Sequence, residues 1–438
     1  MNQLERNMTL GAYNKVAVIG LGYVGLPLAV AFAKHYQVVG YDIDKSRVQE
    51  LNLFNDETLE IDTDELKDVI LAPGGPEGAN GLMFTDDLAQ IAGCTIFIVT
   101  VPTPIDQFKQ PNLEPLKSAS KQIGTVLKKG DIVIYESTVY PGCTEEDCVP
   151  VLESHSGLVF NTDFFVGYSP ERINPGDKSR KVEEIVKITS GSTSEVAALV
   201  DDLYAKVIVA GTYSAPNIKV AEAAKVIENA QRDINIAFVN EIAKICNKLE
   251  ISTQEVLKAA GTKWNFQPYK PGLAGGHCIG VDPYYLALKA KEEGYYPGLI
   301  LAARRLNESM AEHIAAEVVK KMIKKGSLVK GARLLMLGIT FKENCTDSRN
   351  SKIVEVIAYL AEYGIEVTTY DPWANPEKVK DEFGLTILTK LPEEQFDAIV
   401  VGVAHEVFLE INYPSLMKEN TIIYDVKGLL PFEVDGQL

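Results

Sequence analysis

The chain has 438 residues, of which 46% are hydrophobic and 24% are charged, and its formal net charge is -17. This length predicts two or three domains with sizeable cores. The acidic balance argues against a nucleic-acid partner, which would need a basic face, but a few local Lys and Arg side chains can still bind an anionic substrate. No apolar run is long enough to cross a membrane, and the N-terminus has no signal-peptide core. The six cysteines form no CxxC pair, so we expect a cytoplasmic protein without disulfides.

The first part of the chain, residues 1–212, predicts one doubly wound α/β domain. A strand, an apolar helix over 26–36 and a second strand form a βαβ unit. The strands are expected at 15–19, 37–42, 95–101, 131–135, 165–168, 187–189 and 207–210.

The glycines of segment 20–25 (GLGYVG) lie between the first strand and the helix. Gly20 allows a tight turn, Gly22 lets a pyrophosphate approach the backbone, and Gly25 lets helix and strand pack closely. Asp42 ends the second strand, where its carboxylate would bind ribose hydroxyls and repel a 2′-phosphate. The pattern therefore predicts a site for NAD rather than NADP.

Further candidates for the cofactor site lie nearby in the sequence. Arg47 either packs on the adenine or ribose or is a surface charge. The segments 101–104 (VPTP) and 136–138 (EST) follow strands at their carboxyl ends, where they either face the cofactor or only turn the chain. The residues expected at the cofactor are Gly20, Gly22, Tyr23, Val24, Gly25, Asp42, Arg47, Thr103, Ser137 and Thr138.

The middle of the chain, residues 213–328, predicts a helical domain. Residues 217–260 contain neither Gly nor Pro, which indicates a long helix with a bend near 250–253. Lys225 and Asn229 lie one helical turn apart and share a face with Asp233. They could bind an oxyanion, and Lys225 could assist proton removal; the alternative is a solvated helix face.

A glycine-rich loop follows, with Cys278 in the segment 275–282 (GGHCIGVD). A thiol can hold an aldehyde covalently for a second oxidation, which a simple alcohol dehydrogenase does not need. Asp282 would serve as a base or an orienting group. The alternative is that Cys278 is a small buried hydrophobe. His277 is expected to be structural, and no metal site is expected.

Two other loops carry charged residues after strands. Glu171, in the segment 168–176 (YSPERINPG), either activates a water or belongs to an ordinary charged loop. Residues 329–438 predict a second, smaller α/β domain. Its first strand precedes Lys342 and Arg349, which flank a turn and could bind phosphate groups.

Together these motifs resemble the nucleotide-sugar 6-dehydrogenase family, which includes UDP-glucose and GDP-mannose dehydrogenases. The matching segments follow the family's order along nearly the whole chain. They are GLGYVG (20–25), VPTP (101–104), ESTVYPG (136–142), YSPERINPGD (168–177), AEAAKVIENAQRDINIAFVNE (221–241), GGHCIGVDP (275–283) and FKENCTDSRNS (341–351).

The resemblance implies an N-terminal NAD domain, a central helix at a homodimer interface and a C-terminal UDP-binding domain. It implies that Lys225 and Asn229 stabilise an oxyanion and that Asp282 helps to position or to deprotonate through a water. It also implies that Cys278 forms a thiohemiacetal and then a thioester. A water positioned by Thr138 and Glu171 would release the acid, with two NAD used per sugar. Arg349 would lie near the cofactor pyrophosphate. The implied substrate-binding residues are Glu171, Arg172, Lys225, Asn229, Tyr269, Gly275 and Lys342.

Two departures from UDP-glucose enzymes favour a UDP-N-acetylhexosamine substrate. Val281 stands where those enzymes usually carry Lys, and Pro175 stands where they carry a second glutamate. The sequences of the segments SPERINPGD and GGHCIGVDPYYL are most similar to those of UDP-N-acetylglucosamine and UDP-N-acetylgalactosamine 6-dehydrogenases of bacterial surface polysaccharide pathways. The alternatives are UDP-glucose or UDP-N-acetylmannosamine as substrate, a two-electron hydroxyacid dehydrogenase, and a non-catalytic sensor of the same ligands.

Overall fold

The computed structural model describes residues 15–71, 79–106, 108–173, 180–276 and 279–438. By internal contacts the chain divides into two compact units. The first extends to Glu228 and adds Tyr284–Gly294, and the second comprises Asn229–Pro283 and Tyr295–Leu438. The expected division into 1–212, 213–328 and 329–438 stays a prediction.

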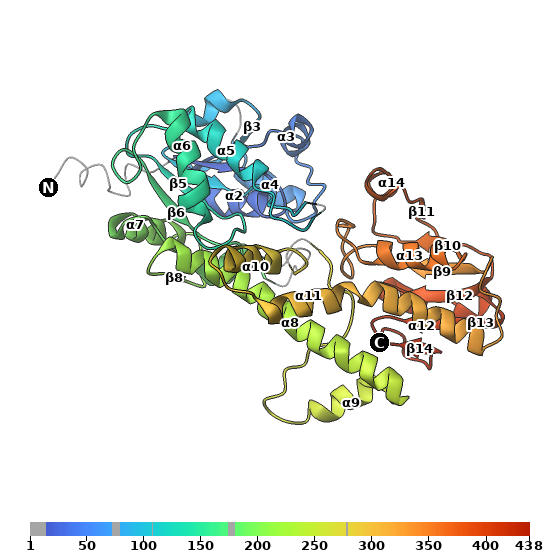
Figure 1. Cartoon of the computed structure of the whole chain (residues 1–438). Coiled ribbons are helices and arrows are strands. Elements are labelled where there is room, and N and C mark those ends of the chain that lie inside the picture. Colours follow the sequence, from blue (N-terminus) through green and yellow to red (C-terminus); the bar gives the residue numbers. More distant parts are fainter. Residues whose placement is uncertain (1–14, 72–78, 107, 174–179, 277–278) are drawn as a thin grey trace. The chain divides into compact units, whose positions relative to one another are not determined.

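The first unit is built on a six-stranded parallel sheet (Figure 1). The strands follow the order β3-β2-β1-β4-β5-β6, which is the dinucleotide-binding topology. The strand order reverses between β1 and β4, so the loops at their carboxyl ends form the ligand-binding edge. The strands are β1 (Lys15–Ile19), β2 (Gln37–Tyr41), β3 (Gly81–Thr85), β4 (Ile96–Val99), β5 (Ile132–Tyr135) and β6 (Phe165–Tyr168).

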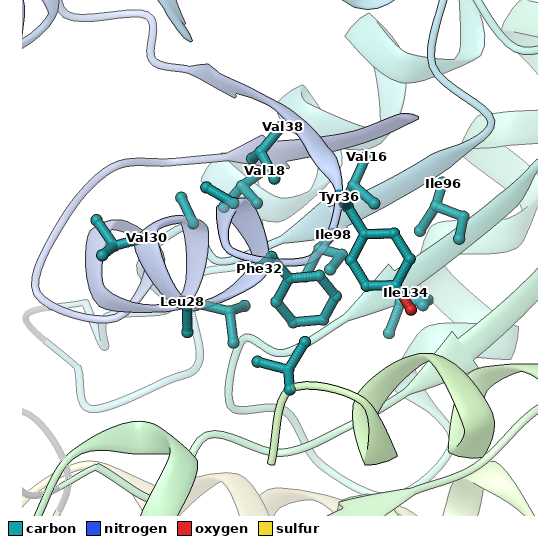
Figure 2. Close-up of a cluster of buried hydrophobic side chains, with 14 of the residues drawn as sticks. Val16, Val18, Leu28, Val30, Phe32, Tyr36, Val38, Ile96, Ile98 and Ile134 are labelled. Carbon is teal, nitrogen blue, oxygen red and sulfur yellow. The ribbon is translucent and has the colours of Figure 1, made fainter. Parts of the chain in front are cut away.

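The core of this unit forms because its central strands are apolar on both faces. Four of the five residues of β1 are buried, and all nine residues of α2 (Gly25–Ala33) are buried. Figure 2 shows aliphatic side chains of the strands gathered around the rings of Phe32 and Tyr36, whose centroids lie 5.8 Å apart. Each such large apolar side chain contributes about 1.5–3 kcal/mol on burial.

Other helices and a small two-stranded sheet complete the first unit. The helices are α3 (Lys45–Asn52), α4 (Thr63–Val69), α5 (Glu114–Gly124), α6 (Val149–Ser156) and α7 (Ser194–Ala205), with short helical turns η2 (Leu88–Ile91), η3 (Thr144–Cys148) and η4 (Val182–Glu184). The small sheet pairs β7 (Lys187–Thr189) with β8 (Thr212–Ser214) in parallel. The strand expected at 207–210 was wrong, because this segment is a turn and the strand begins at Thr212.

The long central helix is α8 (Ile218–Leu249). The expected bend is a complete break, since Glu250 has a φ of 54° and Ser252 caps a separate helix, α9 (Thr253–Ala260). The remaining helices of the middle region are α10 (Asp282–Glu292), α11 (Gly298–Glu308) and α12 (Met310–Lys324). Among the described residues, no helix combines the length and the apolar character needed to cross a membrane.

The second unit contains another six-stranded parallel sheet, ordered β11-β10-β9-β12-β13-β14. This order repeats that of the first sheet, so the prediction of two doubly wound α/β domains with a long helix between them is confirmed. The strands are β9 (Arg333–Leu337), β10 (Glu366–Tyr370), β11 (Ile387–Leu388), β12 (Phe396–Val401), β13 (Met417–Asp425) and β14 (Gly436–Gln437). The helical elements beside them are α13 (Ile353–Glu362), α14 (Pro376–Phe383), η5 (Glu406–Glu410) and η6 (Tyr413–Leu416).

Candidate active site

The glycine loop after β1 has the geometry that a dinucleotide needs. Gly20 has a φ of +94°, which favours glycine. A Cβ on Gly25 would lie 1.8 Å from the carbonyl oxygen of Gly20, whereas a Cβ on Gly22 would meet nothing within 4 Å. Gly22 is exposed, and Tyr23 and Val24 are half-buried. The space at Gly22 therefore suits a pyrophosphate beside the start of α2.

The carboxylate of Asp42 holds this loop from the end of β2. Its Oδ2 accepts the Leu21 N–H at 2.7 Å and its Oδ1 accepts the Asp44 N–H at 2.9 Å. Arg47 donates from Nε to the Leu21 carbonyl at 2.9 Å and pairs with Asp56 at 2.7 Å. Arg47 thus supports the glycine loop, and its contact with a cofactor stays a prediction.

The loops after β4 and β5 are tied together by their hydroxyl groups. Thr103 Oγ1 donates to the Thr138 carbonyl at 2.7 Å, and Ser137 Oγ donates to the Val101 carbonyl at 2.6 Å. Both expected cofactor segments therefore lie together at the carboxyl edge of the sheet, where Thr138 is half-buried. Sequence reasoning placed them at this edge but did not predict that the hydroxyls crosslink the loops.

Glu171 and Arg172 follow β6 in the first unit. The Glu171 side chain is buried, and its Oε1 accepts the Ile173 N–H. Arg172 turns to other partners: its guanidinium donates to Glu228 at 2.5 Å and to the Val186 carbonyl at 3.1 Å. The expected residues 174–177 of this motif, including Pro175, lie outside the described residues.

Helix α8 carries the expected Lys, Asn and Asp. Lys225 is buried, and so is Asp282, the first residue of α10. The Asn229 side chain donates its Nδ2 hydrogen to Asp282 Oδ2. The structure therefore brings together two of the predicted catalytic residues, which are 53 positions apart in the sequence.

Asp233 has a structural partner that the sequence did not indicate. Arg304 on α11 donates to Asp233 Oδ1 at 2.6 Å, and Asn307 donates to the same oxygen at 2.8 Å. Arg304 is 2% exposed and also lies 3.5 Å from the carbonyl oxygen of Ile279. The position of Arg304 on the apolar side of an amphipathic helix was the sequence signal that could have indicated a buried acidic partner. Cys278 precedes Ile279, and it lies outside the described residues together with His277.

The loop after β9 packs against the start of the cysteine loop. A Cβ on Gly275 would lie 2.7 Å from the carbonyl oxygen of Asn350, so this contact requires glycine. Arg349 is paired with Asp347 through two hydrogen bonds of 2.9 Å. Lys342 and Tyr269 are half-buried. The structure thus joins two motifs that the sequence presented separately, and the contacts of these side chains with a ligand stay predictions.

The sequence did not predict a buried His–Asp pair that contacts the loop carrying Lys342. His405 is 0% exposed, its Nδ1 accepts the Asn344 N–H at 2.9 Å, and its Nε2 lies 3.3 Å from Asp371 Oδ2. Asp371 also accepts the Ile339 N–H at 2.7 Å, as Asp42 accepts that of Leu21 in the first sheet. The repeated contact shows that the two sheets hold their first loops in the same way.

Three segments of the chain match the domains of one family. Residues 14–208 match the NAD binding domain of the UDP-glucose/GDP-mannose dehydrogenase family, residues 219–309 match its central domain, and residues 335–431 match its UDP binding domain.

Individual proteins are similar over nearly the whole chain. The UDP-N-acetyl-D-glucosamine 6-dehydrogenase of Pseudomonas aeruginosa is 57% identical over 419 residues, which cover 95% of this chain and 97% of that protein. The Salmonella typhi protein of the same name is 53% identical over 422 residues, covering 96% and 97%. Among solved structures, the UDP-D-ManNAc dehydrogenase of Pyrococcus horikoshii has a TM-score of 0.84 at 31% identity and covers 96% of this chain and 97% of that one.

Proposed function

We propose, from the premise that this chain belongs to the UDP-glucose/GDP-mannose dehydrogenase family, that it oxidises C6 of UDP-N-acetyl-D-glucosamine to the carboxylate with two NAD per sugar. One observation carries the choice of sugar: identity to two UDP-N-acetyl-D-glucosamine 6-dehydrogenases is 57% and 53% over nearly the full chain. Identity to a UDP-D-ManNAc dehydrogenase is 31%. The N-acetylglucosamine epimer is therefore favoured over the N-acetylmannosamine epimer.

The glycine loop and Asp42 are the residues that would hold the cofactor. Gly22 leaves open space beside the N-terminus of α2, and the Asp42 carboxylate lies at the end of β2. A carboxylate at that position favours ribose hydroxyls over a 2′-phosphate. When bound, NAD supplies the acceptor for the hydride that leaves C6. Arg349 would contact the pyrophosphate.

Lys225, Asn229 and Asp282 would act on the C6 oxygen. A buried ammonium and a side-chain amide can stabilise negative charge that develops on this oxygen. The Asn229 amide is held in place for this role because it donates a hydrogen bond to the buried carboxylate of Asp282. Asp282 would also accept the alcohol proton through a water.

Cys278 would hold the aldehyde during the second oxidation. Its sulfur adds to the carbonyl carbon to give a thiohemiacetal, and loss of a second hydride gives a thioester. Water positioned by Thr138 and Glu171 then adds to the thioester carbonyl. The remaining substrate contacts are proposed for Arg172, Tyr269, Gly275 and Lys342.

The decisive experiment is a substrate panel with product counting. The purified protein is incubated with UDP-GlcNAc, UDP-GalNAc, UDP-ManNAc and UDP-glucose, and NADH and uronate are quantified per sugar. We expect two NADH per UDP-GlcNAc and the highest kcat/KM for that sugar. One NADH per sugar would indicate a two-electron dehydrogenase and refute the proposal.

Substitution of the cysteine separates the two oxidations. We expect Cys278→Ser to stop before the acid is released, while Cys94→Ala, which changes a buried cysteine outside the proposed machinery, retains turnover. A Cys278→Ala variant with full activity would support the alternative of a non-catalytic role for this thiol.

We also propose three domains (1–212, 213–328 and 329–438), a cytoplasmic location and a homodimer or higher homo-oligomer. The described cysteines are free, which fits a reducing compartment. Helix α8 exposes several large apolar side chains that a second copy would cover. These are Val220, Ile227, Phe238 and Ile245, with exposed fractions of 42%, 52%, 54% and 48%. Light scattering of the purified protein tests the dimer, and a monomeric mass at micromolar concentration would contradict it.

A further inference from the structure

A buried lysine lies next to the glutamate that the proposed function assigns to the water. Lys187, on the short strand β7, is 2% exposed. Its Nζ lies 2.5 Å from Glu136 Oε2, and the hydroxyl of Tyr204 donates to the other oxygen of Glu136. Burial and the Glu136 carboxylate hold the pKa of Tyr204 well above its ordinary value, so this hydroxyl keeps its proton and remains a donor.

Glu171 shares the same ammonium. Its Oε2 lies 3.8 Å from Lys187 Nζ, and this oxygen is buried without a hydrogen-bond partner among the described residues. Its Oε1 is held by the Ile173 N–H. One oxygen is therefore fixed by the backbone, while the other faces Lys187 and still has an open lone pair.

Two carboxylates and one ammonium thus occupy one buried cluster, which we call the Glu136–Lys187–Glu171 cluster. Burial raises the pKa of Glu136, the Lys187 ammonium opposes this rise, and the Glu171 carboxylate adds to it. Among the described residues, the charged and titratable groups that face Glu171 include Glu136 after β5, Lys187 on β7 and Tyr204 on α7. Without the ammonium, the two buried carboxylates would repel each other with no opposite charge from Lys187 beside them.

A purely structural role is a poor explanation for this lysine. A buried ion pair is often no more stabilising than apolar side chains of the same volume. Lys187 already forms an ion pair of 2.5 Å with Glu136. It also lies 3.8 Å from Glu171 Oε2, an oxygen that has no hydrogen-bond partner among the described residues. Lys187 therefore lies where it can orient the Glu171 carboxylate.

We propose that Lys187 is a positioning residue for the acid-forming step, which holds the Glu171 carboxylate in the direction of the attacking water. The inference rests on the proposed function. In that step the water oxygen bonds to the thioester carbon, its proton passes to Glu171, and the carbon–sulfur bond breaks. The electron pair stays on the Cys278 sulfur, so no further oxidant is needed, because both hydrides have left earlier.

The test compares Lys187→Met with the wild type in stopped-flow and steady-state assays with UDP-GlcNAc and NAD. Met keeps most of the buried volume and removes the charge. We expect the first two NADH per active site to form at close to the wild-type rate and steady-state turnover at pH 7 to fall about ten- to hundredfold.

Two other variants complete the experiment. Lys129→Met removes an exposed lysine that pairs with Asp163 at 3.0 Å and should leave all phases unchanged. If Lys187→Met does not fold, Lys187→Met/Glu136→Gln removes one charge of each sign and restores neutral packing. This double variant should also show a burst of two NADH followed by slow steady-state turnover.

The outcomes separate the inference from the function on which it rests. A wild type that does not give two NADH and uronate refutes the proposed function directly. If the wild type does so, a folded lysine variant with unchanged steady-state turnover overturns the inference. An equal decrease of the burst rate and the steady-state rate also overturns it, because it indicates general damage to the fold.

Discussion

We expect the stability of the first unit to depend on pH because of the buried carboxyl group of Glu222. This residue of α8 is 0% exposed, and its carboxylate accepts the N–H groups of Gly142 at 2.5 Å and Thr144 at 2.9 Å. Burial nevertheless raises its pKa from 4.5 to about 7. The folded state therefore keeps a proton on Glu222 that the unfolded chain has already lost.

The sign and size of the effect follow from this difference. Between about pH 4.5 and pH 7 the folded state binds more protons than the unfolded state, so the stability from this group is complete below pH 4.5 and is lost as the pH rises to 7. The rise in the pKa of Glu222 from 4.5 to about 7 corresponds to about 3 kcal/mol of unfolding free energy, because one pKa unit equals about 1.4 kcal/mol. For a unit of this size, that is a change in Tm of about 6–12 °C.

The measurement is differential scanning calorimetry of the wild type and Glu222→Gln between pH 4.5 and pH 8. The amide resembles the protonated acid and cannot ionise, so the Tm of the variant should gain about 6–12 °C relative to the wild type over this range. Glu241→Gln, an exposed residue of the same helix, is the control and should follow the wild type. Parallel pH curves for wild type and Glu222→Gln would refute the reasoning.

Three other perturbations test the sites more directly. Gly25→Ala brings a Cβ to 1.8 Å from the Gly20 carbonyl oxygen, so NADH affinity measured by fluorescence titration should fall about tenfold or more; unchanged affinity would exclude this loop from the cofactor site. Asn229→Leu removes the amide that donates to buried Asp282, and kcat should fall about a hundredfold with less change in KM; an equal rise in KM at constant kcat would assign Asn229 to binding alone. Phe238→Glu adds a charge to a side chain of α8 that is 54% exposed, and light scattering should show half the wild-type mass; an unchanged dimer would place the interface elsewhere.

Local signals explain why the architecture was predictable from the sequence. The glycine loop is a local motif of six residues, 20–25, and the backbone geometry at Gly20 and Gly25 requires glycine. Most strands of the first sheet are short apolar runs and α8 is a segment without Gly or Pro, so their positions follow from periodicity and breakers. The edge strand β3 (Gly81–Thr85) was not among the expected strands. The error at 207–210 arose because an apolar run of four residues cannot be distinguished from a buried turn.

Long-range pairing explains what the sequence could not predict. Asp233 shares a helix face with Lys225 and Asn229, which suggested a common role, but the fold pairs it with Arg304, 71 positions away. His405 and Asp371 are 34 positions apart and come together only because both lie at the carboxyl edge of one sheet. Such contacts depend on strand order, which no local pattern encodes.

The sequence by itself determined the chemistry available to this protein: a dinucleotide loop, a thiol in a glycine-rich loop, and a Lys, Asn and Asp with the spacing of the family. Only the tertiary structure decided how these groups are held and charged. Asp282 is oriented by Asn229, and Glu171 faces an ammonium that also pairs with Glu136. The physical reason is that the charge state of a buried carboxylate depends on its neighbours in space, and the fold alone brings Lys187 to Glu136 from 51 positions away.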